Sequence, residues 1–216
     1  MKNILFIIIL KSFLFYSLLY AIEIAPFFTI FHGFNALKKD RTLTKLDLVS
    51  MRGESFYLTK NNELKFSGYG YLWTKKSSYS INNRKKVIVK IDLKTDNGEV
   101  IIAFSKNRQD WRSGIADALT FSIRADKNNV FHAVVRTKMY KNFIDNTPIT
   151  FIPLKWHTIT IEVDEYKLVS YIDDIKIKEI DISTIQFPLD GYIGLAQFNK
   201  NKNTYIKNFY IEESYF

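Results

Sequence analysis

Short runs in which apolar and polar side chains alternate fill the chain from residue 55 onward. In residues 87–93, Val87, Val89, Ile91 and Leu93 lie on one face and Lys90 lies on the other. A period of two is typical of a β-strand with one buried and one solvated face. Such runs predict strands at residues 63–66, 70–74, 87–93, 100–105, 118–125, 130–137, 157–163, 168–172, 192–198 and 204–211.

Turn-forming residues separate these runs, and no long helical period occurs between residues 55 and 216. The predicted turns are Asp96-Asn97-Gly98, residues 126–129, Asp164-Glu165 and Asp173-Asp174. Short strands without crossover helices indicate antiparallel sheets that stack on each other. We therefore expect an all-β, antiparallel two-sheet jelly-roll sandwich over residues 55–216, with no linker or repeat that divides it.

The first 21 residues resemble a secretory signal peptide, with a lysine near the start and two apolar runs. Lys11 between these runs disfavours a membrane-spanning helix, because a charge in mid-span costs about 2.5–3.5 kcal/mol. Cleavage is expected after Ala21, or as late as Ala25, and an uncleaved membrane anchor is the alternative. Residues 22–54 form an entry segment with a short helix or irregular structure. The predicted location is the periplasm, the cell surface or the medium.

Composition and charge narrow the possible partners. The chain has 16% aromatic residues, which favours β-structure. Its net charge of +9 comes from lysines and arginines scattered along the whole sequence, without a basic arm or nucleic-acid-binding motif. No specific nucleic-acid partner is therefore expected. The chain has no cysteine, which excludes disulfides, thiolate metal sites and a cysteine nucleophile.

The last third of the sequence carries the most specific motifs. These are WHTITIEV from Trp156, YIDD from Tyr171, GYIGL from Gly191 and NFYI from Asn208. Their order resembles the end of concanavalin A-like domains, in particular laminin-G-like domains and bacterial 3-keto-disaccharide hydrolases. The resemblance covers roughly residues 55–214. It implies a jelly-roll fold, and it implies carbohydrate binding or hydrolysis far less directly.

One segment resembles a catalytic motif. Residues 179–184, EIDIST, begin like the E-I-D-I-x-E signature of family 16 glycoside hydrolases, in which two carboxylates on alternate strand positions cleave the glycosidic bond. The second glutamate is missing, since Ser183 and Thr184 follow instead. We interpret the segment as a solvated strand end and predict no catalytic residue.

The predicted binding residues lie in one loop and on the polar faces of strands. Trp111 and Arg112 belong to a polar loop, where the indole either stacks on a sugar or anchors the loop over a sheet edge. Ser122, Arg124, His132 and Arg136, together with Gln197 on a late strand, either form a shallow groove for a sugar or an anionic glycan, or are an ordinary wet sheet face. The candidate carbohydrate-binding residues are therefore Trp111, Arg112, Arg124, His132, Arg136 and Gln197.

These observations favour an exported module that binds carbohydrate or another cell-envelope polymer without a complete catalytic site. The alternatives are a periplasmic glycoside or disaccharide hydrolase and a structural or adhesive surface protein. No cofactor or metal is predicted. A structural calcium ion would need loop carboxylates such as Asp110, Asp117, Asp173 and Asp190, and these form no calcium-loop string. Contact with a membrane is expected only through the N-terminal segment, if this segment stays uncleaved.

Overall fold

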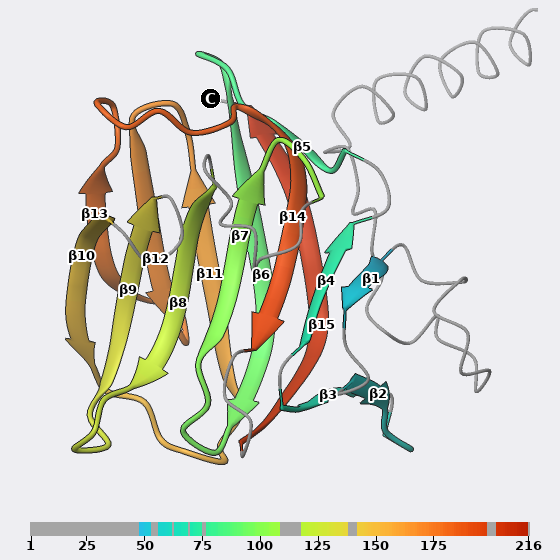
Figure 1. Ribbon diagram of the computed structural model, residues 1–216. Helices are drawn as coiled ribbons and strands as arrows, with labels where there is room; N and C mark the ends of the chain where they lie inside the picture. The colour runs from blue at the N-terminus through green and yellow to red at the C-terminus, as the bar shows by residue number, and fades with distance from the viewer. Residues whose placement is uncertain are drawn as a thin grey trace, which may run out of the picture.

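A computed structural model describes residues 48–52, 56–61, 63–68, 70–74, 77–108, 118–137, 142–197 and 202–215. The predicted signal peptide and most of the entry segment lie outside these residues. The described chain is an all-β antiparallel sandwich without a helix (Figure 1). It accordingly contains no helix with the length and hydropathy to cross a membrane.

Two antiparallel sheets form the sandwich, and Figure 1 shows the first in front of the second. Sheet A has the strand order β1 (Leu48–Arg52), β4 (Gly70–Thr74), β14 (Asp190–Gln197), β7 (Val100–Ser105), β8 (Leu119–Ala125), β9 (Phe131–Thr137) and β10 (Asn142–Ile149), and β5 (Tyr79–Ser80) also pairs with β14. Sheet B has the order β13 (Ile175–Asp181), β12 (Lys167–Ile172), β11 (His157–Val163), β6 (Lys85–Thr95), β15 (Asn203–Tyr215), β3 (Leu64–Ser67) and β2 (Phe56–Leu58).

All ten predicted strands are confirmed, since each overlaps a strand of the sandwich. The strands without a prediction are β1, β2, β10 and β13, which are the edges of the two sheets, and the two-residue β5. An edge strand pairs on one side only and is less constrained to alternate, so β10 contains Pro148 and β13 reads IKIKEID with most side chains exposed. β1 begins at Leu48, within the segment for which a short helix or irregular structure is expected.

The inward faces of the two sheets form one hydrophobic core. In β6 the residues Val87, Val89, Ile91 and Leu93 are buried, as the alternation predicts. From sheet A, Leu72, Val100, Ile102, Phe104 and Phe121 pack against them. Burial of these side chains stabilises the fold by roughly 1.5–3 kcal/mol each.

The predicted turns are confirmed. Asn97, Asn129, Asp173 and Asp174 have φ angles of 71°, 60°, 51° and 64°, in the left-handed region that Asn and Asp tolerate better than most residues. At the turn before β12, the carboxylate of Asp164 accepts hydrogen bonds from the following backbone amides. The turns at residues 126–129, 164–165 and 173–174 set the register of the hairpins that they close, whereas the turn at residues 96–98 connects β6 of sheet B to β7 of sheet A and closes no hairpin.

The outward face of sheet A forms a second buried layer. Trp73, Ile101, Ala103, Ala118 and Ala196 form an apolar cluster in which no side chain is more than 1% exposed. Gly194 gives the Trp73 indole its space, because a Cβ on this glycine would lie 2.7 Å from the ring. The middle of this sheet therefore presents no open surface to solvent.

Candidate functional site

The structure places Gln197 on the inward face of sheet A. Gln197 pairs with Val100 of the core, whereas Ala196 and Gly194 lie on the outward face. The Gln197 amide is fully buried and donates hydrogen bonds to the carbonyl oxygens of Gly68 and Lys202. The expectation that Gln197 shares a polar face with the strand residues Arg124, His132 and Arg136 is therefore wrong, because the side-chain period of two points it the other way.

Arg136 lies on the outward face but is buried, with 3% exposure. Its guanidinium forms an ion pair with Glu99 at 3.1 Å, and the same carboxylate oxygen accepts a hydrogen bond from the Ser122 hydroxyl at 3.2 Å. Of these side chains only Glu99 is partly accessible. Arg136 and Ser122 thus hold part of the outward layer of sheet A together, and the expectation of an open groove at this position is wrong.

Arg124 and His132 lie directly opposite each other at one end of β8 and β9, on the outward face of the sheet. Both are partly exposed, and His132 Nε2 lies 3.6 Å from a carboxylate oxygen of Asp126. Backbone amides of Val130 and Asn128 donate to Asp126 and, together with His132, lower the pKa of its carboxyl group. His132 therefore has the carboxylate partner that was not recognised in the sequence. This end of sheet A is an accessible polar site.

Trp111 and Arg112 lie outside the described residues. The chain leaves the described part at Arg108 and re-enters it at Ala118, next to the start of β8. Arg124 lies at the other end of that strand, about 17 Å from its start at 3.3 Å per residue. Of the predicted site residues on strands, Arg124 and His132 thus lie at the accessible end of sheet A. Arg136 lies in the buried outward layer of this sheet, and Gln197 lies on its inward face.

The E-I-D-I segment lies on β13, the edge of sheet B. Lys176 donates to Glu179 at 2.5 Å and lowers the pKa of this carboxyl group, with Lys167 contributing. The hydroxyl and amide of Ser183 donate to Asp181 and lower the pKa of its carboxyl group. A general acid needs a raised pKa. Both carboxylates stay ionised, and neither is suited to protonate a glycosidic oxygen.

The loop carboxylates considered for calcium have other contacts where they are described. Asp173 binds His157 and the amide of Thr158, and Asp190 forms an ion pair with Lys106 at 2.5 Å. Asp110 and Asp117 lie outside the described residues. Within the described part of the chain, no three His, Asp or Glu side chains are grouped as metal ligands.

His157 is buried at one end of the core, where its contacts hold neighbouring segments together. Its Nδ1 lies 2.7 Å from Asp173 Oδ2, and its ring packs against Phe151 at a centroid distance of 4.2 Å. Partial burial raises the pKa of Asp173, but hydrogen bonds from the Thr158 amide and His157 outweigh this effect, so that the pKa is lowered. This pair joins the β12–β13 turn to the start of β11.

The outward face of sheet B carries an accessible row of lysines and aromatic rings that was not predicted. The Lys94 ammonium lies 4.6 Å from the ring centroid of Trp156 and 4.4 Å from that of Tyr205. The Lys65 ammonium lies 5.3 Å from the ring centroid of Tyr205, and the Lys207 ammonium lies 4.3 Å from that of Trp156. These distances are those of cation–π contacts. We call these five residues the lysine–aromatic row.

Pairing across sheet B explains the row. Tyr205 lies opposite both Lys94 of β6 and Lys65 of β3, and Trp156 directly precedes β11. The lysines are isolated in sequence, and only the register of distant strands gathers them. A sequence signal does exist, because each residue lies on the polar side of an alternating run. That signal says which face the side chains share and does not say which strands are neighbours.

Comparison with known proteins gives the class of fold. No protein-family model and no curated protein sequence matches the chain. Among solved structures, the carbohydrate-binding module CBM66 from Bacillus subtilis aligns with a TM-score of 0.58 at 12% identity, over 77% of this chain and 95% of the module.

Two further structures are similar. The metal-free carbohydrate recognition domain of Emp46p has a TM-score of 0.60 at 12% identity, over 84% of this chain and 95% of that domain. The alginate lyase AlyC3 has a TM-score of 0.54 at 16% identity, over 76% of this chain and 80% of the lyase. The chain thus has the concanavalin A-like jelly-roll fold that the C-terminal motifs resemble. At these identities the likeness defines the fold and leaves the ligand to be argued from the side chains.

Proposed function

We propose that this protein is an exported, non-catalytic module that binds carbohydrate, with a polymer of the cell envelope as its ligand. Structural neighbours with this fold include a carbohydrate-binding module and a carbohydrate recognition domain, which supports the class of ligand. The apolar N-terminal segment supports export. The lowered pKa values of Glu179 and Asp181 support binding without hydrolysis.

The observation that carries the proposal is the open end of sheet A. Here a guanidinium, an imidazole and a carboxylate, from Arg124, His132 and Asp126, are neighbours on an accessible sheet face. Paired donors and acceptors of this kind suit the vicinal hydroxyl groups of a sugar ring. Trp111 and Arg112 remain part of the proposed site as sequence predictions.

Binding of the full chain to a glycan array and to insoluble cell-wall polysaccharides tests this function. We expect retention of the wild type and about tenfold weaker binding by the double variant Arg124→Ala/His132→Ala, which removes contacts worth roughly 1.4 kcal/mol in total. Lys127→Ala, in the exposed turn between the same strands, is the matched control and should bind like the wild type.

Trp111→Ala tests the loop separately. Equal retention of wild type and this variant would remove Trp111 from the site and leave the function intact. If no carbohydrate retains the wild type, while a protein ligand does, the chain is an adhesive or structural protein instead.

A further inference from the structure

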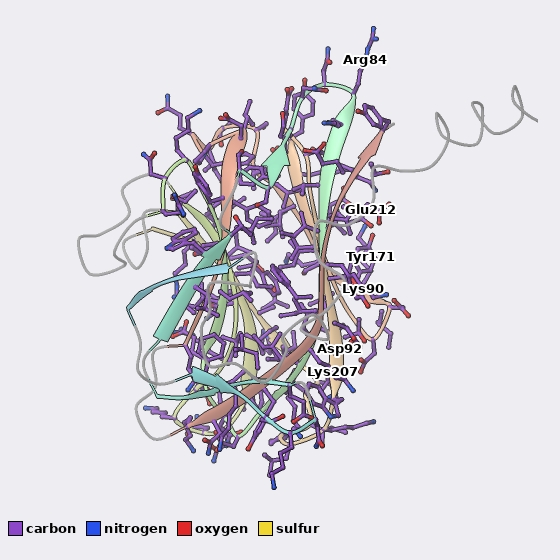
Figure 2. The ribbon with its side chains drawn as sticks, turned by 90° about the vertical axis from the view of Figure 1, so that its right-hand side faces the viewer. Arg84, Lys90, Asp92, Tyr171, Lys207 and Glu212 are labelled. Atoms are coloured by element: carbon purple, nitrogen blue, oxygen red, sulfur yellow. The ribbon has the colours of Figure 1, made fainter. Side chains whose placement is uncertain are left out.

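We infer that the lysine–aromatic row is a binding surface for an acidic polysaccharide. The inference rests on the proposed function, because it names the chemical class of carbohydrate and a second face that binds it. Figure 2 shows the outward face of sheet B from the side, with Lys90, Asp92 and Lys207 projecting from it into solvent.

The first argument is unpaired positive charge. Lys94 and Lys207 both lie over the indole of Trp156, and in the described part of the chain no carboxylate forms an ion pair with either. Asp92 lies opposite Lys207 across the sheet, but Thr158 and Asn208 hydrogen-bond its two oxygens at 2.8 and 2.6 Å. Two ammonium groups held by one ring repel each other, and a bound anion would relieve this repulsion.

The other lysines of the same face differ. Lys86 forms an ion pair with Glu162 at 2.6 Å, and Lys176 forms one with Glu179 at 2.5 Å. Within the row, Lys94 and Lys207 therefore project from sheet B without an ion pair to a carboxylate of the described residues. Its positive charge is available to a ligand.

A bulge in β15 fixes the geometry. The register shifts between Lys207 and Tyr210, and Asn208 has a φ of 49°. Because of this shift, Phe209 enters the core, whereas Lys207 pairs opposite Asp92 and Tyr210 pairs opposite Lys90, both on the outward face. Bulges re-aim side chains in this way at functional sites. The Asn208 side-chain amide donates a hydrogen bond to Asp92 Oδ2 at 2.6 Å.

The neighbouring side chains favour a sugar polymer over other polyanions. Hydroxyl groups of Thr160, Tyr171 and Tyr210 continue the outward face next to the row, and they can bind sugar hydroxyls. The ammonium groups occupy faces of both rings, which leaves less aromatic surface for the base stacking that single-stranded nucleic acid uses. The row also contains no arginine for bidentate phosphate contacts.

Affinity electrophoresis of the full chain with polygalacturonate, and with its methyl-esterified and therefore neutral form, tests the inference. We expect retardation by the acidic polymer alone, and weaker retardation as salt shortens the Debye length from about 30 Å at 0.01 M to about 3 Å at 1 M. The double variant Lys94→Gln/Lys207→Gln should bind on the order of tenfold more weakly. Lys94→Arg/Lys207→Arg keeps the charge and should retain most of the binding.

The control Lys167→Gln/Lys176→Gln removes the same charge from β12 and β13, at the other end of the strand order of sheet B, where both lysines lie near Glu179. It should bind like the wild type. Equal losses in both double variants would overturn the inference, since the net charge alone would then explain binding. Equal binding of the esterified polymer would also overturn it and leave carbohydrate binding standing. Binding of duplex DNA or anionic phospholipid vesicles, without any polysaccharide, would overturn both proposals.

Discussion

The outward faces of the two sheets have the same alternating geometry and opposite exposure to solvent. On sheet A, Trp73, Ile101 and Val134 are at most 1% exposed, and the ion pair of Arg136 is buried with them. On sheet B, half-buried and exposed lysines, threonines and tyrosines alternate with the core residues. The difference teaches that a polar residue on a strand face marks an open surface only if its neighbours on adjacent strands are polar as well.

The largest expected effect comes from the two tryptophans. Trp73→Ala should reduce the free energy of unfolding by about 3–5 kcal/mol, because it removes a fully buried ring. Trp156→Ala should cost less than half as much, since Trp156 is half-buried and contacts lysines. Urea unfolding of both variants measures the difference. Similar losses would mean that both faces are equally structural.

Gly194 sharpens the comparison on sheet A. A Cβ at this position would lie 2.7 Å from the Trp73 ring, so Gly194→Ala should cost up to about 3 kcal/mol through overpacking. The double variant Gly194→Ala/Trp73→Leu should lose less than the sum of the two single variants, because the clash partner is gone. Strict additivity in thermal unfolding would contradict the contact.

The ion pairs of the two faces should differ in strength. Glu99→Gln should cost about 1–2 kcal/mol, because it leaves the guanidinium of buried Arg136 without its charged partner. Glu162→Gln, which removes the partner of half-exposed Lys86, should cost less than about 1 kcal/mol. Denaturant midpoints at low and high salt compare them, and a larger salt dependence for the Glu99 pair would contradict its burial.

The smallest effect is a pH dependence at the end of sheet B. The pKa of Asp173 is lowered from its ordinary value of 3.8, so the folded state binds this proton less readily than the unfolded state. Its contribution is present above that value and is lost as the pH falls through the lower folded pKa. Asp173→Asn should therefore be less stable than wild type at pH 6, by less than about 1 kcal/mol after solvent screening, and the gap should close near pH 2.

Melting temperatures of wild type and Asp173→Asn across this pH range measure the gap. The neighbouring turn variant Asp174→Asn is the control, because Asp174 does not contact His157. A gap that stays constant with pH would assign the effect of Asp173→Asn to turn geometry and not to ionisation.

Ten strands and the turns between them could be predicted, because a strand between two neighbours must bury every second side chain. The edges β10 and β13 could not, since Pro148 and a run of exposed lysines and acids are tolerated where one side of the strand is unpaired. For the candidate site, the sequence correctly assigns Arg124 and His132 to the outward face. The assignment of Gln197 to the same face is wrong, because a difference of one position along a strand moves a side chain to the other face of the sheet.

The buried outer layer of sheet A has a sequence signal of its own. The run VIIAFS of β7 is apolar at every position up to Phe104, and such continuous runs indicate strands that are buried on both faces. The small residues Ala103, Gly194 and Ala196 complete this pattern beneath Trp73.

By itself the sequence determined the class of fold, the alternation of the inner strands and the chemistry of the turns, because these depend on residues adjacent in the chain. The tertiary structure alone decided which strands are neighbours. It brought Lys65, Lys94, Trp156, Tyr205 and Lys207 into one row from four separate segments, and it buried Arg136 against Glu99. The physical reason is that side-chain contacts across a sheet follow from strand order and register, which long-range packing selects and local patterns leave open.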